Sequence, residues 1–123
     1  MNNSFKNKLI IIVLFLLAFL LRIYGFNWDN NNHLHPDERF LTMVANDIKI
    51  PISLSQYLNT ATSPLNPYNN PSYQFFVYGT FPIFLTKILA VFLHLDNYNQ
   101  ITLLGRILSA LFDSGNIILL YFI

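Results

Sequence analysis

The sequence predicts an all-α integral membrane protein, in which spanning helices are joined by an external loop that carries in-plane juxtamembrane helices. Hydrophobic residues make up 54% of its 123 residues and charged residues only 11%, whereas soluble domains carry about 25% charged residues. Three apolar segments cover residues 9–26, 75–95 and 101–123. The stretch between the first two is rich in Asn and Pro, which is typical of a loop.

Residues 9–26 predict the first transmembrane helix. Residues 9–21 are apolar without interruption but are too short alone for a hydrocarbon core of about 30 Å; their continuation brings the run to roughly 18 residues, which is enough. Lys6 and Lys8 precede the run, and the positive-inside rule therefore places residues 1–8 in the cytoplasm. No small-residue cleavage site follows the run, so an uncleaved anchor is favoured over a signal peptide.

Residues 27–74 then form an external loop that contains an amphipathic helix over about residues 36–49. Pro36 suits the first helical position, and the carboxylates of Asp37 and Glu38 complement the positive end of the helix dipole. One apolar stripe follows at helical spacing. It consists of Phe40, Leu41, Val44 and Ile48.

Residues 75–95 fit either a spanning helix or a juxtamembrane helix that lies in the membrane plane. Lys87 falls near the middle of the segment, and a lysine at the bilayer centre costs about 2.5–3.5 kcal/mol. We expect this lysine to snorkel to the interface. Thr80, Lys87 and His94 recur every seven residues, which predicts one polar stripe on a helix.

Residues 101–123 are the stronger candidate for a span, truncated at its end. A polar stripe with spacings of four and three runs along them. It consists of Thr102, Arg106, Ser109, Asp113 and Asn116. Arg106 and Asp113 lie two turns apart, so each is expected to find its partner on another helix, and the chain offers few candidates. Because the chain also stops inside an apolar run, we interpret it as the N-terminal part of a larger polytopic protein.

Composition excludes several classes of function. A net charge of +1 gives no indication of nucleic-acid binding. The absence of cysteine rules out disulfides, thiolate metal sites and cysteine nucleophiles. There is no Gly-rich phosphate loop and no serine-elbow motif.

The acidic pair Asp37 and Glu38 is the main candidate for chemistry. It follows the first apolar run, so it is expected where a helix leaves the bilayer. A carboxylate in a partly desolvated site can accept a hydroxyl proton as a general base. The alternative is that the pair only complements the helix dipole.

A metal site built from protein side chains alone is not predicted. His33, His35 and Asp37 alternate along the chain and would share one side of an extended segment. Pro36 favours the start of a helix at that point, which breaks the alignment. No cofactor is therefore assigned, although one carboxylate could help hold a divalent cation on a phosphate. Arg39 can pair with an acid or bind a phosphate.

Five segments together resemble one protein family. They are residues 21–25 (LRIYG), 35–40 (HPDERF), 60–68 (TATSPLNPY), 78–82 (YGTFP) and 105–113 (GRILSALFD). In this order they are similar to the start of polytopic GT-C glycosyltransferases that depend on a phospholipid carrier. The nearest groups are the protein O-mannosyltransferases and the lipid A aminoarabinose transferase. The resemblance covers nearly the whole chain.

The resemblance implies a multi-pass enzyme of the cell membrane that moves a sugar from a polyprenyl-phosphate carrier to an acceptor on the external face, usually with inversion. By this resemblance Asp37 is the candidate base that deprotonates the acceptor, and Glu38 orients acceptor or base. Arg39 and His35, which flank the pair, are the candidate substrate-binding residues. The family also carries further helices and most of its carrier site beyond this region, so no turnover is expected from 123 residues alone.

Two other functions stay open on the sequence. A non-catalytic membrane subunit or remnant could use the same surface for assembly, and the reading frame after Ile123 would discriminate it from an enzyme. A transporter fragment could use Arg106 and Asp113 to line a path, and substrate flux after reconstitution would reveal it.

Overall fold

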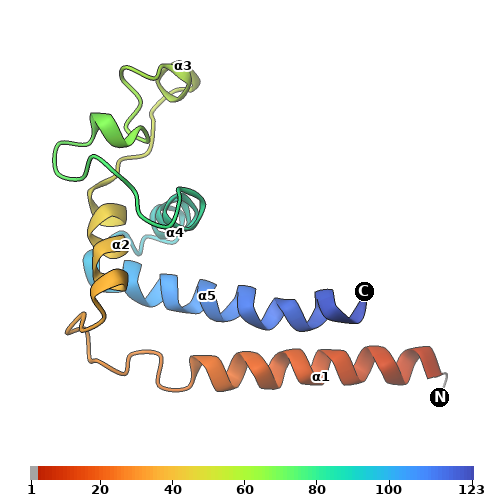
Figure 1. The fold of residues 1–123 in the computed structure, drawn as a ribbon. Coiled ribbons are helices and arrows are strands. Elements are labelled where there is room, and N and C mark those ends of the chain that lie inside the picture. Colours follow the sequence, from red (N-terminus) through yellow and green to blue (C-terminus); the bar gives the residue numbers. More distant parts are fainter. Residues whose placement is uncertain (1–2) are drawn as a thin grey trace. The chain divides into compact units, whose positions relative to one another are not determined.

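The computed structural model describes residues 3–123, and every regular element among them is helical (Figure 1). The elements are α1 (Asn3–Ile23), α2 (Pro36–Asp47), α3 (Leu54–Leu58), the 3-10 helix η1 (Pro67–Asn69), α4 (Phe81–Phe92) and α5 (Tyr98–Tyr121). No strand occurs in the described range, so the all-α part of the predicted fold class is confirmed. The chain divides into two compact units. One joins the residues up to Trp28 with Arg106–Ile123, and the other is Asp29–Gly105.

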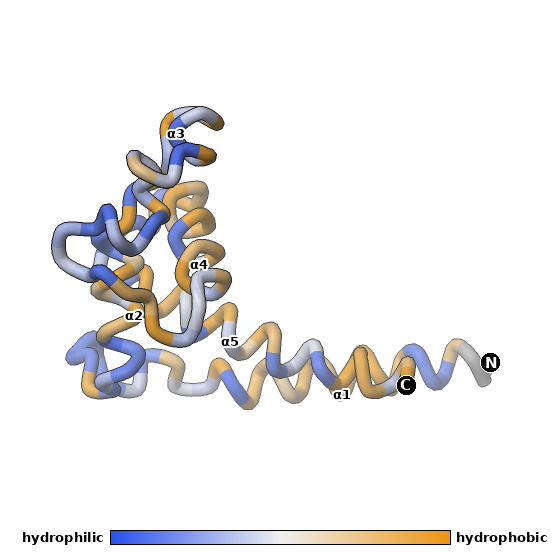
Figure 2. The backbone as a smooth tube through the Cα atoms, turned by 45° about the horizontal axis from the view of Figure 1, so that its top comes forward, coloured by the Kyte–Doolittle hydropathy of each residue, from blue (hydrophilic) through white to orange (hydrophobic). Residues whose placement is uncertain are grey.

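In the first unit, α1 and the later turns of α5 run side by side in opposite directions (Figures 1 and 2). The sequence predicts a helix over residues 9–26, but α1 begins earlier and ends at Ile23. Its last turn closes with a bond of 3.0 Å from the Tyr24 amide to the Leu20 carbonyl. Gly25 then has a φ of +65°, a left-handed conformation that commonly ends helices.

Within the described residues, α5 is the one helix that is long and apolar enough, judged by length and composition, to cross a membrane. The 24 residues of α5 extend about 36 Å at 1.5 Å per residue, more than a core of about 30 Å. The apolar part of α1 is shorter because Lys8 and Arg22 bound it. A membrane location is therefore compatible with the structure, and the polytopic arrangement stays a prediction.

The segment predicted as a helix over residues 75–95 contains a much shorter helix. The 12 residues of α4 span only about 18 Å, which is less than a bilayer core. Pro82 lies in its first turn, and Gly79 before it has a φ of +84°. Because these two residues set the start of α4, the preceding residues stay outside the helix.

The second unit is built on the packing of α2 against α4. The sequence predicts helix 36–49, and α2 ends at Asp47. Val44 and Ala45 of α2 are 0% and 2% exposed, and Ile83 and Ala90 of α4 are 2% and 0% exposed. These small and β-branched side chains form the apolar core of the unit.

The Asn-rich loop between α2 and α4 is organised by its own side chains. Asn66 and Asn70 use their Oδ1 atoms to accept backbone amides of residues that follow them, at 2.7–3.2 Å. Asn69 donates to the carbonyls of Thr60 and Ser63 at 2.9 and 3.0 Å. Asx turns of this kind offer the backbone an alternative to long helices, which explains why only α3 and η1 form here.

The expectation that Lys87 snorkels to the interface is wrong. Lys87 is 4% exposed, and its Nζ lies 2.7 and 3.0 Å from the two carboxylate oxygens of Asp96. The stripe of every seventh residue is also absent, because Thr80 lies before the first residue of α4 and His94 follows its end with a φ of +58°. Lys87 thus fixes α4 to the loop that leads into α5.

Candidate active site at the start of α2

The predicted acidic pair lies in the first turn of α2. His35 is the N-cap and accepts the Glu38 amide through Nδ1 at 3.4 Å, and Pro36 takes the first helical position. Asp37 is exposed and Glu38 is half-buried. The carboxylates therefore lie at the positive end of the helix dipole, where negative charges stabilise a helix.

Asp37 has a neighbour that the sequence did not indicate. The Asp37 carboxylate raises the pKa of the Tyr78 phenol, which lies just before α4, above its usual value of 10.0. It does so first as a hydrogen-bond acceptor and second through its negative charge. From the sequence, Tyr78 is most simply interpreted as an interfacial aromatic residue. No local signal identifies the contact, because it joins residues far apart in the chain.

His35 and Arg39, the candidate substrate-binding residues on either side of the acidic pair, make different contacts. His35 uses Nδ1 to cap α2, a structural role that the sequence did not assign to it. Arg39 is exposed and interacts electrostatically with the phenol of Tyr98 in the first turn of α5. Phe40 packs on Tyr73 with an interplanar angle of 87° at 5.8 Å between ring centroids. The start of α2 is thus surrounded by aromatic side chains from two other segments.

A buried polar network supports the segment that leads into α2. His33 is 7% exposed, with Nε2 2.8 Å from Asn99 Oδ1 and Nδ1 3.1 Å from Thr102 Oγ1. Thr102 in turn lies 3.0 Å from Thr42 Oγ1 of α2. Because buried polar groups are costly unless they are bonded, this network ties the loop before the acidic pair to both α2 and the start of α5.

Arg106 and Asp113 belong to the first unit, whereas the acidic pair belongs to the second. Arg106 donates to the Phe26 carbonyl at 2.8 Å and lies 5.5 Å from the ring centroid of Trp28. Asp113 forms an ion pair with Arg22 of α1. The sequence predicts that each residue finds its partner on another helix. This is confirmed for Asp113, whose partner Arg22 belongs to α1. Arg106 instead contacts residues that follow the end of α1, and the further helices that the stripe predicts stay a prediction.

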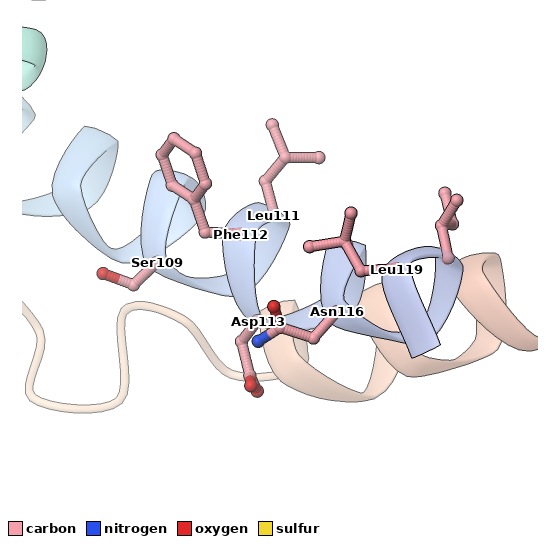
Figure 3. Close-up of a pocket in the computed structure, with 8 residues that line it drawn as sticks. Ser109, Leu111, Phe112, Asp113, Asn116 and Leu119 are labelled. Atoms are coloured by element: carbon pink, nitrogen blue, oxygen red, sulfur yellow. The ribbon is translucent and has the colours of Figure 1, made fainter. Parts of the chain in front are cut away.

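An open hollow of about 590 Å³ lies on α5 and is lined by eight residues of that helix (Figure 3). Its polar side chains include Asp113 and Asn116. All of its lining comes from one helix, so it is a groove on a helix surface and not an enclosed site.

No cluster of three or more His, Cys, Asp and Glu side chains that could hold a metal ion occurs within residues 3–123. Comparison of the chain with protein-family models, with curated proteins and with solved structures finds no match.

Proposed function

We propose that this chain is the N-terminal portion of a membrane glycosyltransferase that transfers a sugar from a polyprenyl-phosphate carrier to an acceptor on the external face. The observation that carries the proposal is an exposed carboxylate, Asp37, in the first turn of α2 beside Glu38 and Arg39. A carboxylate and a guanidinium in the same helical turn suit a reaction that removes a proton and releases a phosphate.

The proposed reaction is a substitution at the anomeric carbon. Asp37 accepts the proton of the acceptor hydroxyl as the oxygen forms its bond to that carbon. The bond between the anomeric carbon and the carrier phosphate breaks, and the polyprenyl phosphate leaves with the electron pair. Glu38 orients the acceptor or the base, while Arg39 holds the phosphate through charge-assisted hydrogen bonds. A divalent cation held partly by a carboxylate could assist the leaving phosphate.

The proposed topology places the N-terminus in the cytoplasm and the acidic pair at the outer rim of the membrane. In support, Lys6 and Lys8 lie at the start of α1. The short helix α4 suits an in-plane position, because one face packs on α2 while the opposite face exposes large apolar side chains. These are Phe81, Ile88, Val91 and Phe92. An apolar face of this kind can enter the boundary between headgroups and acyl chains.

The topology predicts a labelling pattern for introduced cysteines, which the chain otherwise lacks. Ala61→Cys and Asn97→Cys should both react with an impermeant thiol reagent added outside cells, because α4 does not cross. Asn7→Cys should react only after permeabilisation. Protection of Asn97→Cys in intact cells, with labelling after lysis, would mean that the segment around α4 spans. External labelling of Asn7→Cys would place the acidic pair in the cytoplasm and exclude the proposed reaction there.

The activity is tested directly with the protein expressed from its complete reading frame and reconstituted in vesicles. The donor probe is polyprenyl-phosphate mannose with a radiolabelled sugar, and the aminoarabinose-bearing carrier is used in parallel. Transfer of label from the carrier to material in a cell-envelope extract is the expected result. If neither donor supports transfer and the label crosses the vesicle membrane instead, a transporter is favoured. If there is neither transfer nor movement of label across the membrane, a non-catalytic subunit is favoured.

A further inference from the structure

We propose that His33 and Thr102 are positioning residues that hold the first turn of α2, and with it the acidic pair, in place for the proposed reaction. The inference rests on the proposed function, because both residues act on sugar transfer only through Asp37 and Glu38. Three features of the second unit support it. They are a hydroxyl group that joins both ends of the segment, the exposure of the residues between those ends, and the backbone conformation at His33.

One hydroxyl group joins the two ends of the segment that carries the acidic pair. Thr102 Oγ1 of α5 lies 3.1 Å from His33 Nδ1, ahead of α2, and 3.0 Å from Thr42 Oγ1, within α2. The acidic pair lies between His33 and Thr42 in the chain. His33, Thr42 and Thr102 are 7%, 4% and 4% exposed, and a fully bonded buried network fixes one arrangement of its members. The segment is therefore held at both ends.

The second imidazole nitrogen sets the direction of these bonds. Nε2 of His33 lies 2.8 Å from Oδ1 of Asn99, and because an amide oxygen only accepts, Nε2 carries the proton. Nδ1 of the neutral imidazole is then an acceptor, and the Thr102 hydroxyl donates to it. The ring of Tyr98 packs against the imidazole at 4.3 Å between centroids. His33 is thus held in one tautomer and one orientation.

The residues between the two held ends have little packing of their own. Residues 34–37 are all exposed, and Leu34 is 63% exposed. A bond of 3.3 Å from the Leu34 amide to Asp29 Oδ2 ties the loop to itself. Exposed side chains contribute little to fixing a backbone, so the start of α2 takes its position mainly from the polar contacts at the ends of the segment.

The backbone at His33 is strained. His33 has a φ of +50°, a left-handed conformation that is uncommon for residues other than glycine, although His, Asn and Asp adopt it more often than most. Such conformations persist where the surrounding structure over-determines them, and they cluster at functional sites. The two buried bonds of the His33 side chain are the contacts that hold this residue, four positions before Asp37.

The first test measures the hydrogen bond without any enzyme assay. The protein from its complete reading frame, in lipid nanodiscs, is labelled with ¹⁵N-histidine, and His33→Asn identifies the His33 signals. We expect the proton on Nε2, and Thr102→Val should shift the Nδ1 signal toward that of a nitrogen without a hydrogen bond. Thr102→Ser should leave it in place. The exposed His94 is the control and should not respond to either variant. An unchanged Nδ1 signal of His33 in Thr102→Val would overturn the proposal.

The second test uses transfer from radiolabelled polyprenyl-phosphate mannose. Thr102→Val keeps the shape of the side chain without its hydroxyl and should lower kcat about 10–100-fold, since a misplacement of about 1 Å can cost about 100-fold. KM should change less. Thr102→Ser keeps the hydroxyl and should restore most of kcat. The matched control is Thr86→Val in α4. The Thr86 hydroxyl donates to the Pro82 carbonyl of its own helix at 2.8 Å, so both constants should stay unchanged.

Two further variants keep the test independent of a single substitution. His33→Asn retains a residue type that tolerates a left-handed backbone, but its shorter side chain cannot bond to both Asn99 and Thr102. Thr42→Val removes the other contact of the Thr102 hydroxyl. Both should lower kcat as Thr102→Val does. In each, the Thr102 hydroxyl can still donate to the Tyr98 carbonyl, 3.1 Å away, so the fold should persist.

The outcomes separate a positioning role from a structural one. Thermal unfolding is measured for each variant, and kcat is compared at a temperature where all are folded. If Thr102→Val is less stable but keeps kcat when folded, the positioning role is excluded and the proposed function stands. In the Asp37→Asn background, Thr102→Val should cause little further loss, because a positioning residue acts through its partner. If Asp37→Asn retains full activity, the proposed function itself fails, and the positioning role with it.

Discussion

Replacement of Asp37 by Asn is expected to lower kcat for sugar transfer by about 10²–10⁴-fold, the usual contribution of a general base. The amide has nearly the shape of the carboxylate but cannot accept a proton from the acceptor hydroxyl. Asp37 is exposed, so the fold around α2 should persist. Initial rates with radiolabelled polyprenyl-phosphate mannose measure the effect, with expression and helical content checked in parallel.

The matched control is Asp47→Asn. Asp47 is exposed at the other end of the same helix, so its replacement removes the same charge without touching the proposed site, and kcat should stay unchanged. If Asp37 only complements the dipole of α2, Asp37→Asn would cost about 0.3–1 kcal/mol of stability with kcat intact. That outcome would remove Asp37 from the mechanism.

Asp96→Asn is expected to destabilise the second unit by about 2–3 kcal/mol. Breaking a buried ion pair by removing one partner usually costs about 3–5 kcal/mol. We expect a smaller loss here because the Asp96 side chain is 36% exposed. The variant leaves the Lys87 ammonium, 5% exposed, without its counterion. Lys87→Met should cost less, because the remaining carboxylate can turn to water. Unfolding in mixed micelles, followed by circular dichroism, measures both free energies.

Two further variants test the cause of this effect. Lys49→Met removes an exposed lysine from the same unit and should change the unfolding free energy by less than about 0.5 kcal/mol. The double variant Lys87→Met with Asp96→Asn should be more stable than Asp96→Asn alone, because no buried charge remains. A double variant as unstable as Asp96→Asn would show that the ion pair is not the source of the loss.

Local sequence patterns predicted where the helices lie more accurately than how they end. The start of α2 follows from Pro36 and the two carboxylates after it, and the structure adds His35 as the cap. The end of α1 and the start of α4 depart from the predicted bounds at Gly25 and Gly79, both of which have positive φ. An apolar run in the sequence continues across such residues, because hydropathy carries no information on the backbone conformation that ends a helix.

Contacts between distant segments were not predictable. Lys87 with Asp96, Arg22 with Asp113 and His33 with Asn99 each join different elements of the chain. Helical spacing tells which side chains share a face of one helix, but it carries no information on what that face meets. For this reason the sequence left Arg106 and Asp113 without partners that the chain itself supplies.

By itself, the sequence determined the helical class, the apolar segments and the adjacent acids that begin α2, because hydrophobic periodicity, proline and charge act over a few residues. Only the tertiary structure decided that a lysine in an apolar helix is buried on Asp96 and that His33 is bonded to Asn99 and Thr102 of α5. The physical reason is that burial and hydrogen bonding depend on which surfaces pack together, and packing joins residues that no local pattern relates.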